Sequence, residues 1–183
     1  MSAWFTTAGG SDPSSLPAAT EITTGQGGAM QFGAEGDNGA LVYSAEEAFY
    51  SIGCNCPGWS ADNAGAHFVL YEWQGSIDAT LATSALGTVD FVPYKDNSWL
   101  ELSVDNSGYG GSTGNAKFPA GTYMLHMTRV QNNFGFWSAA SYPESLSFYK
   151  NGSQQSWVPA TRVQFHSPME YGFSGQIKYF TAA

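Results

Sequence analysis

The chain has 183 residues, of which 15% are Phe, Trp or Tyr and only 11% carry a charge. Six basic residues against fifteen acidic ones give a net charge of −9, which argues against nucleic acid, anionic membranes and strongly acidic polysaccharides as partners. No stretch reaches the roughly 18 apolar residues of a membrane span. A neutral ligand is therefore expected.

Residues 1–28 are predicted to form a flexible N-terminal arm or linker, because 8–28 are rich in Gly, Ser, Pro and Thr. The start Met1-Ser2-Ala3-Trp4 has neither the basic residues nor the apolar run of a signal peptide. The protein is therefore either cytoplasmic or a mature segment with a new start Met. The scarcity of Lys favours an extracellular protein. We expect a mature segment, excised from a larger secreted enzyme, with residues 29–183 as a single domain.

Short apolar or alternating runs lie between clusters of Gly, Pro, Asn and Asp along the rest of the chain, which is typical of an all-β fold. Residues 44–49 begin like a helix but allow one turn at most. About ten strands predict an antiparallel β-sandwich of the jelly-roll type. The expected strands are 29–34, 40–43, 48–53, 67–73, 88–94, 99–104, 122–129, 135–139, 146–149, 162–166 and 176–181.

Several connections carry their own signals. Residues 106–115 (NSGYGGSTGN) predict a long loop, and Asn151-Gly152 predicts a type I′ hairpin turn. Cys54 and Cys56 are one residue apart, so a disulfide between them would close a strained ring, and a zinc site would need two more ligands. Free or locally bridged thiols in a loop are expected.

Side-chain alternation indicates which residues of a strand face the core. In the strand 99–104, Leu100 and Leu102 share one apolar face. Trp99 and Glu101 then share the opposite face, where a core ring would not be expected. Several strands show this combination of an apolar face and a polar face with aromatic interruptions, which a carbohydrate-binding surface requires.

Six Trp and ten Tyr are more than one core of this size needs, and aromatic faces stack well on sugar rings. The strand 67–73 is apolar on both faces except at Glu72, which predicts a central strand with Tyr71 and Trp73 in the core. Other rings are expected at the surface. The predicted ligand-binding residues are Trp99, Trp137, Trp157, Glu101, Trp59 and Tyr109.

Four Asp-Asn dipeptides lie in predicted turns. Asp and Asn favour turns because their side chains cap local backbone groups, and this explanation is sufficient. The alternative is a structural calcium ion held by loop oxygens, with Asp62 and Asp96 as its candidate ligands. No segment matches an EF-hand loop.

No catalytic signature stands out. His67, His126 and His166 are scattered, and no metal-spaced pair, nucleophile elbow, phosphate loop or dinucleotide fingerprint is present. A glycosidase would need two carboxylates flanking a sugar. The candidates for such a pair are Glu47, Asp90, Glu101 and Glu170.

Six short segments carry a family resemblance: LYEW (70–73), TLA (80–82), DNSWLEL (96–102), PAGTY (119–123), GFW (135–137) and YKNG (149–152). Together they resemble the β-sandwich domains of the carbohydrate-binding-module type that are appended to secreted bacterial glycan-degrading enzymes. The similarity covers about residues 48–166. It implies a secreted, non-catalytic binding domain, often with a structural calcium ion.

The sequence therefore predicts a non-catalytic module that binds a neutral polysaccharide by aromatic stacking and hydrogen bonding. Two alternatives remain open. One is a structural or adhesive β-protein of a phage or surface assembly, whose aromatic residues lie in subunit contacts. The other is a small β-sandwich glycan lyase or hydrolase.

Overall fold

The computed structural model describes residues 20–31, 35–56, 64–93, 98–103, 117–131, 134–165 and 175–183. Within these ranges the chain forms thirteen strands and one short helix. In chain order they are β1 (Thr20–Glu21), β2 (Thr24–Gln31), β3 (Gly39–Ala45), β4 (Ser51–Cys56), β5 (Gly65–Glu72), α2 (Ile77–Leu81), β6 (Gly87–Pro93), β7 (Ser98–Ser103), β8 (Gly121–Gln131), β9 (Gly135–Ser141), β10 (Leu146–Lys150), β11 (Ser153–Gln154), β12 (Thr161–Gln164) and β13 (Gly175–Tyr179).

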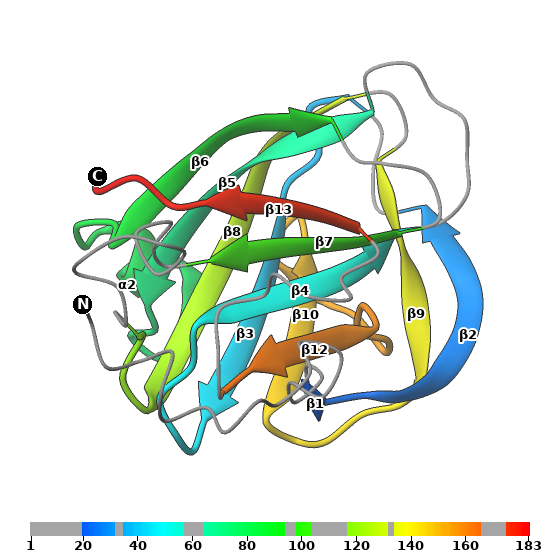
Figure 1. The fold of residues 1–183 in the computed structure, drawn as a ribbon. Coiled ribbons are helices and arrows are strands. Elements are labelled where there is room, and N and C mark those ends of the chain that lie inside the picture. Colours follow the sequence, from blue (N-terminus) through cyan, green and yellow to red (C-terminus); the bar gives the residue numbers. More distant parts are fainter. Residues whose placement is uncertain are drawn as a thin grey trace, which may run out of the picture.

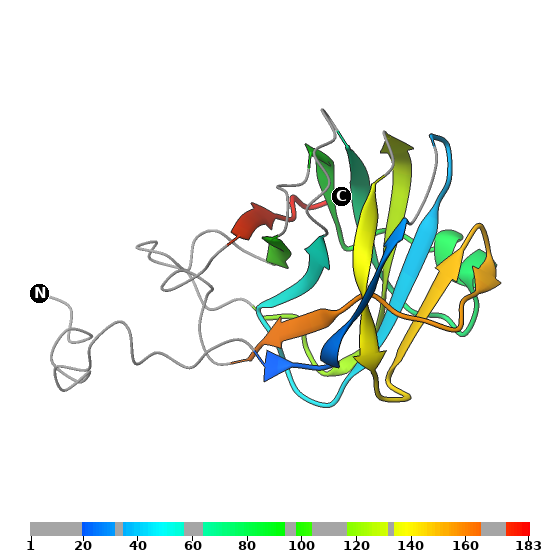
Figure 2. The ribbon, with the colours of Figure 1, turned by 90° about the vertical axis from the view of Figure 1, so that its right-hand side faces the viewer.

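The strands form the β-sandwich that the alternating runs predict (Figures 1 and 2). One sheet has the order β11-β10-β3-β8-β5-β6, the other has the order β1-β12-β4-β7-β13, and β2 pairs with β9 in a two-stranded sheet. The described pairings are antiparallel except for β13 and β7, which run parallel. Backbone hydrogen bonds of 2.9 Å between Thr88 and Thr181, one in each direction, join the two large sheets at one edge.

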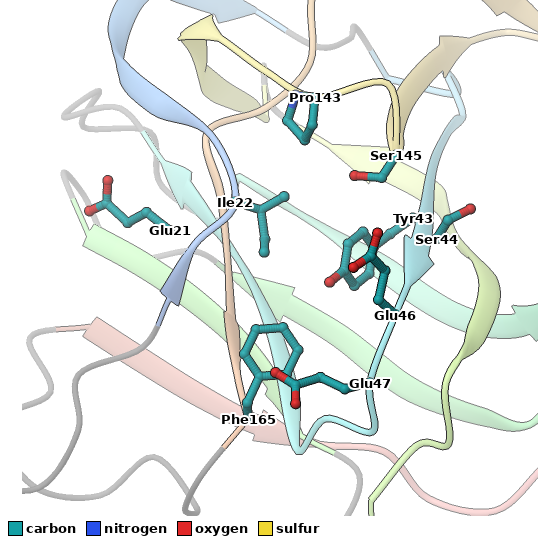
Figure 3. A pocket seen from close by; sticks show the side chains of 9 residues that line it. All are labelled: Glu21, Ile22, Tyr43, Ser44, Glu46, Glu47, Pro143, Ser145 and Phe165. Carbon is teal, nitrogen blue, oxygen red and sulfur yellow. The ribbon is translucent and has the colours of Figure 1, made fainter.

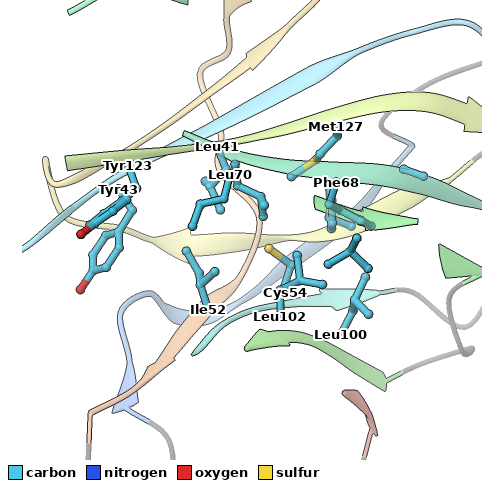
Figure 4. Packing of buried hydrophobic residues seen from close by; sticks show 14 of the residues in the cluster. Leu41, Tyr43, Ile52, Cys54, Phe68, Leu70, Leu100, Leu102, Tyr123 and Met127 are labelled. Carbon is cyan, nitrogen blue, oxygen red and sulfur yellow. The ribbon is translucent and has the colours of Figure 1, made fainter. Parts of the chain in front are cut away.

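Alternating side chains from both large sheets fill the space between them (Figure 4). Leu100 and Leu102 of β7 are buried in this core, as their alternation predicts. Aromatic rings complete it: Phe49 contacts Tyr123 edge-on, with ring centroids 5.5 Å apart. Burial of such side chains is the main favourable contribution to folding.

Part of the predicted N-terminal arm belongs to the sheets. β1 pairs with β12, and β2 pairs with β9 across an irregularity between Gln26 and Ala29. Gly27 allows Ser138 of β9 to lie close to the backbone of β2, because a Cβ at Gly27 would lie 2.5 Å from Ser138 Oγ. The Ser138 hydroxyl donates a 2.9 Å hydrogen bond to the carbonyl of Gly28. Composition alone suggests a linker here because it does not distinguish packed glycines from flexible ones.

The helical turn predicted for residues 44–49 is not formed, because β3 continues to Ala45 and Phe49 makes a β-bridge to Phe118. The helix lies at α2, where Ser76 accepts a hydrogen bond from the Ala79 N–H as N-cap. The described residues include no helix long and apolar enough to span a membrane.

The Asn151-Gly152 turn matches its prediction. Asn151 and Gly152 have φ angles of 48° and 79°, as a type I′ turn requires, and they connect β10 to β11.

The contrast between two neighbouring glycines tests the packing of β2. Gly27→Ala should lower the free energy of unfolding by about 1–3 kcal/mol, because the added methyl group displaces the Ser138 hydroxyl from its hydrogen bond. Gly28→Ala is the matched control, since nothing lies within 4 Å of its Cβ position. Urea unfolding of both variants measures the difference, and equal stability of the two would contradict this account of β2.

Candidate functional site

The outer face of the six-stranded sheet carries a second apolar cluster, separate from the main core. Ala40 and Val42 of β3 and Met124 of β8 are buried there, although they point away from the other sheet. Val42 pairs with Met124, and Met124 pairs with Tyr71, so these side chains form a row across three strands. Partly buried aromatic rings pack over them.

Two of these rings come from distant parts of the sheet. Trp73 follows β5 directly, whereas Tyr149 belongs to β10, and β3 and β8 lie between those strands. The ring centroids are nevertheless 6.4 Å apart, with an angle of 33° between the planes. Tyr71 and Ile77 of α2 extend the same cluster. We call Tyr71, Trp73 and Tyr149, lying over Ala40, Val42 and Met124, the aromatic face.

Neutral polar groups surround the aromatic face. The backbone N–H of Trp73 donates to the Thr122 carbonyl, and the hydroxyls of Thr122 and Ser44 share a hydrogen bond of 2.8 Å. His126 lies opposite Ala40 in the register, and burial lowers its pKa below the ordinary histidine value. Its ring is therefore neutral at pH 7 and offers one donor and one acceptor.

The aromatic face differs from the core position expected for Tyr71 and Trp73. The strand is central, lying between β8 and β6, as its apolar character predicts. Its core side, however, carries Phe68 and Leu70. In the sequence, Phe68 and Leu70 alternate with Tyr71 and Trp73, which indicates that the two pairs lie on opposite faces of the strand. Because both faces are apolar, the alternation did not indicate which of them is the outer face.

The five-stranded sheet has a different outer face, on which two of the predicted site residues meet. Glu101 of β7 is fully buried and pairs with Arg162 of β12 through its Oε1 and the arginine Nε. The Arg162 guanidinium also lies 4.3 Å from the centre of the Trp99 ring. Trp99 and Glu101 therefore share a face, as predicted, but Arg162 already contacts both of them.

A glycine makes this ion pair possible. Gly53 of β4 lies opposite Glu101 on one side and opposite Arg162 on the other. A Cβ on Gly53 would lie 2.4 Å from the Glu101 carboxylate, which crosses that position to reach the arginine. Burial raises the pKa of Glu101 above its ordinary value, while the charge of Arg162 and the neighbouring Ser51 lower it.

The three predicted tryptophans do not form one site. Trp99 lies opposite Asn55, whose N–H donates to the Ala160 carbonyl, and the Ala160 N–H donates to the Trp137 carbonyl. Trp137 therefore lies in the row of Trp99 but three strand spacings away, roughly 14 Å. Trp157 packs elsewhere, against the core, with its ring 4.9 Å from that of Phe148.

Several other predicted residues lie outside the described ranges. These are Trp59 and Tyr109 among the binding candidates, Asp62 and Asp96 as calcium ligands, and the carboxylate candidate Glu170. Within the described ranges, no group of three or more His, Cys, Asp or Glu side chains is placed to hold a metal ion.

Cys54 and Cys56 occupy strand β4, where a loop was expected, and both are free and buried. Burial, with a smaller contribution from Glu101, raises the pKa of Cys54 to about 12, and burial raises that of Cys56 well above its ordinary value. Both thiols are protonated at neutral pH and act as small core side chains.

A pocket of about 510 Å³ opens at the end of β3, between this strand with the turn before β10 on one side and β1 with the residue after β12 on the other (Figure 3). The carboxylates of Glu46 and Glu47 and the hydroxyl of Tyr43 lie along it together with apolar side chains, and Glu21 borders it with its carboxylate pointing away (Figure 3). Glu47 was a candidate catalytic carboxylate. Glu46, the preceding residue in the sequence, also lines the pocket, and only the fold brings Ile22 and Phe165 close to these two carboxylates, so no sequence spacing indicated the group.

Comparison of the chain with protein-family models, with curated proteins and with solved structures gives no match. The function is therefore argued from the side chains themselves.

The ion pair on the five-stranded sheet has a testable dependence on pH. Arg162→Met should lower the free energy of unfolding by about 3–5 kcal/mol at pH 7, because it leaves the Glu101 charge buried without a partner. The variant should also raise the folded-state pKa of Glu101 further. A carboxyl whose pKa is higher in the folded state than in the unfolded state stabilises the fold fully at a pH below its unfolded-state pKa. This stabilisation is lost as the pH rises through the folded-state pKa. The deficit relative to wild type should therefore shrink towards pH 4.

Urea unfolding at pH 4 and pH 7 measures this deficit. The double variant Glu101→Gln, Arg162→Met is the control: it should recover part of the stability at pH 7 and lose the added pH dependence. A deficit in Arg162→Met that is equal at both pH values would rule out a buried, ionised Glu101 as its cause.

Proposed function

We propose that this protein is a non-catalytic carbohydrate-binding module that binds a neutral polysaccharide on its aromatic face. Under this proposal it acts outside the cell, where it holds an attached enzyme or a cell close to its substrate and raises the local concentration of binding sites.

The observation that carries the proposal is the meeting of Trp73 and Tyr149 on an outer surface. Both rings are partly exposed, 33° from parallel, and rest on side chains that are buried beneath them. Rings held in this way lose little freedom when a ligand stacks on them, and the apolar C–H faces of a pyranose match them in chemistry.

The surroundings of the rings favour a neutral ligand. Thr122, Ser44 and the neutral His126 supply hydroxyl and imidazole groups that can exchange hydrogen bonds with sugar hydroxyls. The outer face of the five-stranded sheet is less suitable, because Arg162 already covers Trp99 and because Glu101 and Gly53 are buried.

Burying one sugar face against one ring contributes roughly 1–3 kcal/mol at the usual value per unit of apolar area. Two such contacts with a few hydrogen bonds correspond to dissociation constants of roughly millimolar to micromolar. Modules of this strength depend on several contacts made at once along a polymer, which suits a surface with more than one ring.

Substitutions on the aromatic face test the proposal. Trp73→Ala and Tyr149→Ala should each weaken polysaccharide binding about tenfold or more, because either change removes one stacking surface. Trp73→Phe should fall between wild type and Trp73→Ala. Affinity electrophoresis against cellulose, xylan, mannan, β-1,3-glucan and xyloglucan, with and without calcium, measures binding, and assays for reducing ends and for unsaturated lyase products in the same samples measure cleavage.

Tyr142→Ala is the matched control, because Tyr142 is an exposed ring (40%) outside the aromatic face. Folded Trp73→Ala and Tyr149→Ala proteins that bind as well as wild type would refute this site, and Trp99→Ala and Trp137→Ala in the same gels would then test the other face. Absence of binding together with concentration-dependent assembly would favour the structural alternative. Release of sugar would favour an enzyme.

A further inference from the structure

The pocket beside the aromatic face combines two kinds of wall. Ile22, Pro143 and Phe165 make it apolar, and Glu46 and Glu47 bring two carboxylates to it, whereas the side chain of Glu21, which also borders it, points away (Figure 3). These residues come from both large sheets: β1 and the residues after β12 on one side, and β3 with the turn before β10 on the other. The pocket is therefore a product of the closed fold.

The charged side chains that line the pocket are acidic, although the Lys117 ammonium donates a 2.9 Å hydrogen bond to the Phe165 carbonyl at its border. Among the described residues, no Lys or Arg lines the pocket, and neither Glu46 nor Glu47 forms an ion pair. The two carboxylates of Glu46 and Glu47 create a negative potential in this space that favours a cationic group. The apolar side chains of Ile22, Pro143 and Phe165 can pack against the carbon atoms of an organic cation, so we take a cation of this kind as the ligand.

A buried tyrosine supplies an independent indication of a ligand. Tyr43 is only 4% exposed, and its ring packs edge-on against Phe49 with centroids 5.8 Å apart. Its hydroxyl points into the pocket (Figure 3) and has no hydrogen-bond partner among the described residues. Burial, then Glu47 and Glu46, raise its pKa to about 12, so the group is a phenol that can both donate and accept.

The size and position of the pocket narrow the choice of ligand. A volume of about 510 Å³ lies within the usual range for small-molecule sites, and it accommodates one sugar ring. Ser44 lines the pocket and also bonds to Thr122, the residue next to Trp73 across the sheet. A glycan lying on the aromatic face would therefore have the pocket beside it.

We propose that this pocket binds an amino-sugar unit of a glycan, with its protonated amine held by Glu46 and Glu47, a hydroxyl on Tyr43, and its ring against Ile22 and Phe165. The inference rests on the proposed function, because it takes neutral sugar rings of a glycan to lie on the aromatic face while an amino-sugar unit of the same glycan occupies the pocket. It adds a preference for glycans that carry free amino groups.

Calorimetric titration with a glucosamine tetramer and with the matched N-acetylglucosamine tetramer tests this inference, at a pH where the free amine is protonated. Wild type should bind the free-amine tetramer at least about tenfold more tightly. Glu46→Gln and Glu47→Gln should each reduce that ratio severalfold, and Tyr43→Phe should weaken binding of the free-amine tetramer while retaining the core ring. Glu144→Gln is the matched control, since Glu144 adjoins Pro143 but does not line the pocket, and it should keep the wild-type ratio.

Thermal unfolding of each variant checks that the fold is intact. Equal affinity of wild type for the two tetramers would overturn the inference, as would equal effects of Glu144→Gln and Glu46→Gln, which would indicate a general attraction to the negative surface. If neutral polysaccharides bind in a Trp73-dependent manner while the tetramers show no preference, the pocket inference fails and the proposed function stands. If no glycan binds at all, the proposed function fails first.

Discussion

Close packing between the two large sheets decides where every other side chain of this protein lies. Each strand that buries Phe, Leu or Met on its inner side must present its alternate residues on the outer side. With only 11% charged residues, the chain cannot cover those outer sides with charge. It covers the six-stranded sheet with aromatic rings over small and flexible apolar side chains, and it places a buried ion pair across the five-stranded sheet. Both outer faces are therefore consequences of how the core is filled.

The strand register brings the two members of the ion pair within reach of each other. Glu101, Gly53 and Arg162 occupy one row across three strands, and the absence of a side chain at the middle position lets the carboxylate cross to the guanidinium. Arginine suits the far end of this row because its planar group can bond a carboxylate with its edge and lie over the Trp99 ring with its face, which a lysine ammonium cannot do. The arrangement holds Trp99 in place and at the same time limits what else that ring can contact.

Local patterns predicted the sandwich and the inward positions of Leu100 and Leu102, because alternation is a property of single strands. They predicted the Asn151-Gly152 turn because these two residues themselves tolerate the positive φ angles that the turn requires. The features that local patterns did not predict depend on residues that other strands bring close. The glycines of β2 are packed only because Ser138 lies opposite, and Trp73 meets Tyr149 only because two intervening strands carry side chains that leave room above them. The pocket is the extreme case, since Ile22, Tyr43 and Phe165 converge from well-separated segments.

The aromatic face and the acidic pocket meet at the end of β3, where Ser44 borders both. This proximity has an energetic consequence if a single glycan spans the two. Stacking on Trp73 does not depend on the charge of the substituents on a sugar ring, whereas the carboxylates of Glu46 and Glu47 distinguish an ammonium group from an acetamide by charge. The face would then supply most of the affinity and the pocket most of the selectivity, and because both are held by the same strand, contact with one places the next sugar unit close to the other at a high effective concentration. The net charge of −9 adds a long-range attraction for a glycan that carries protonated amino groups, which a neutral surface of the same shape would lack.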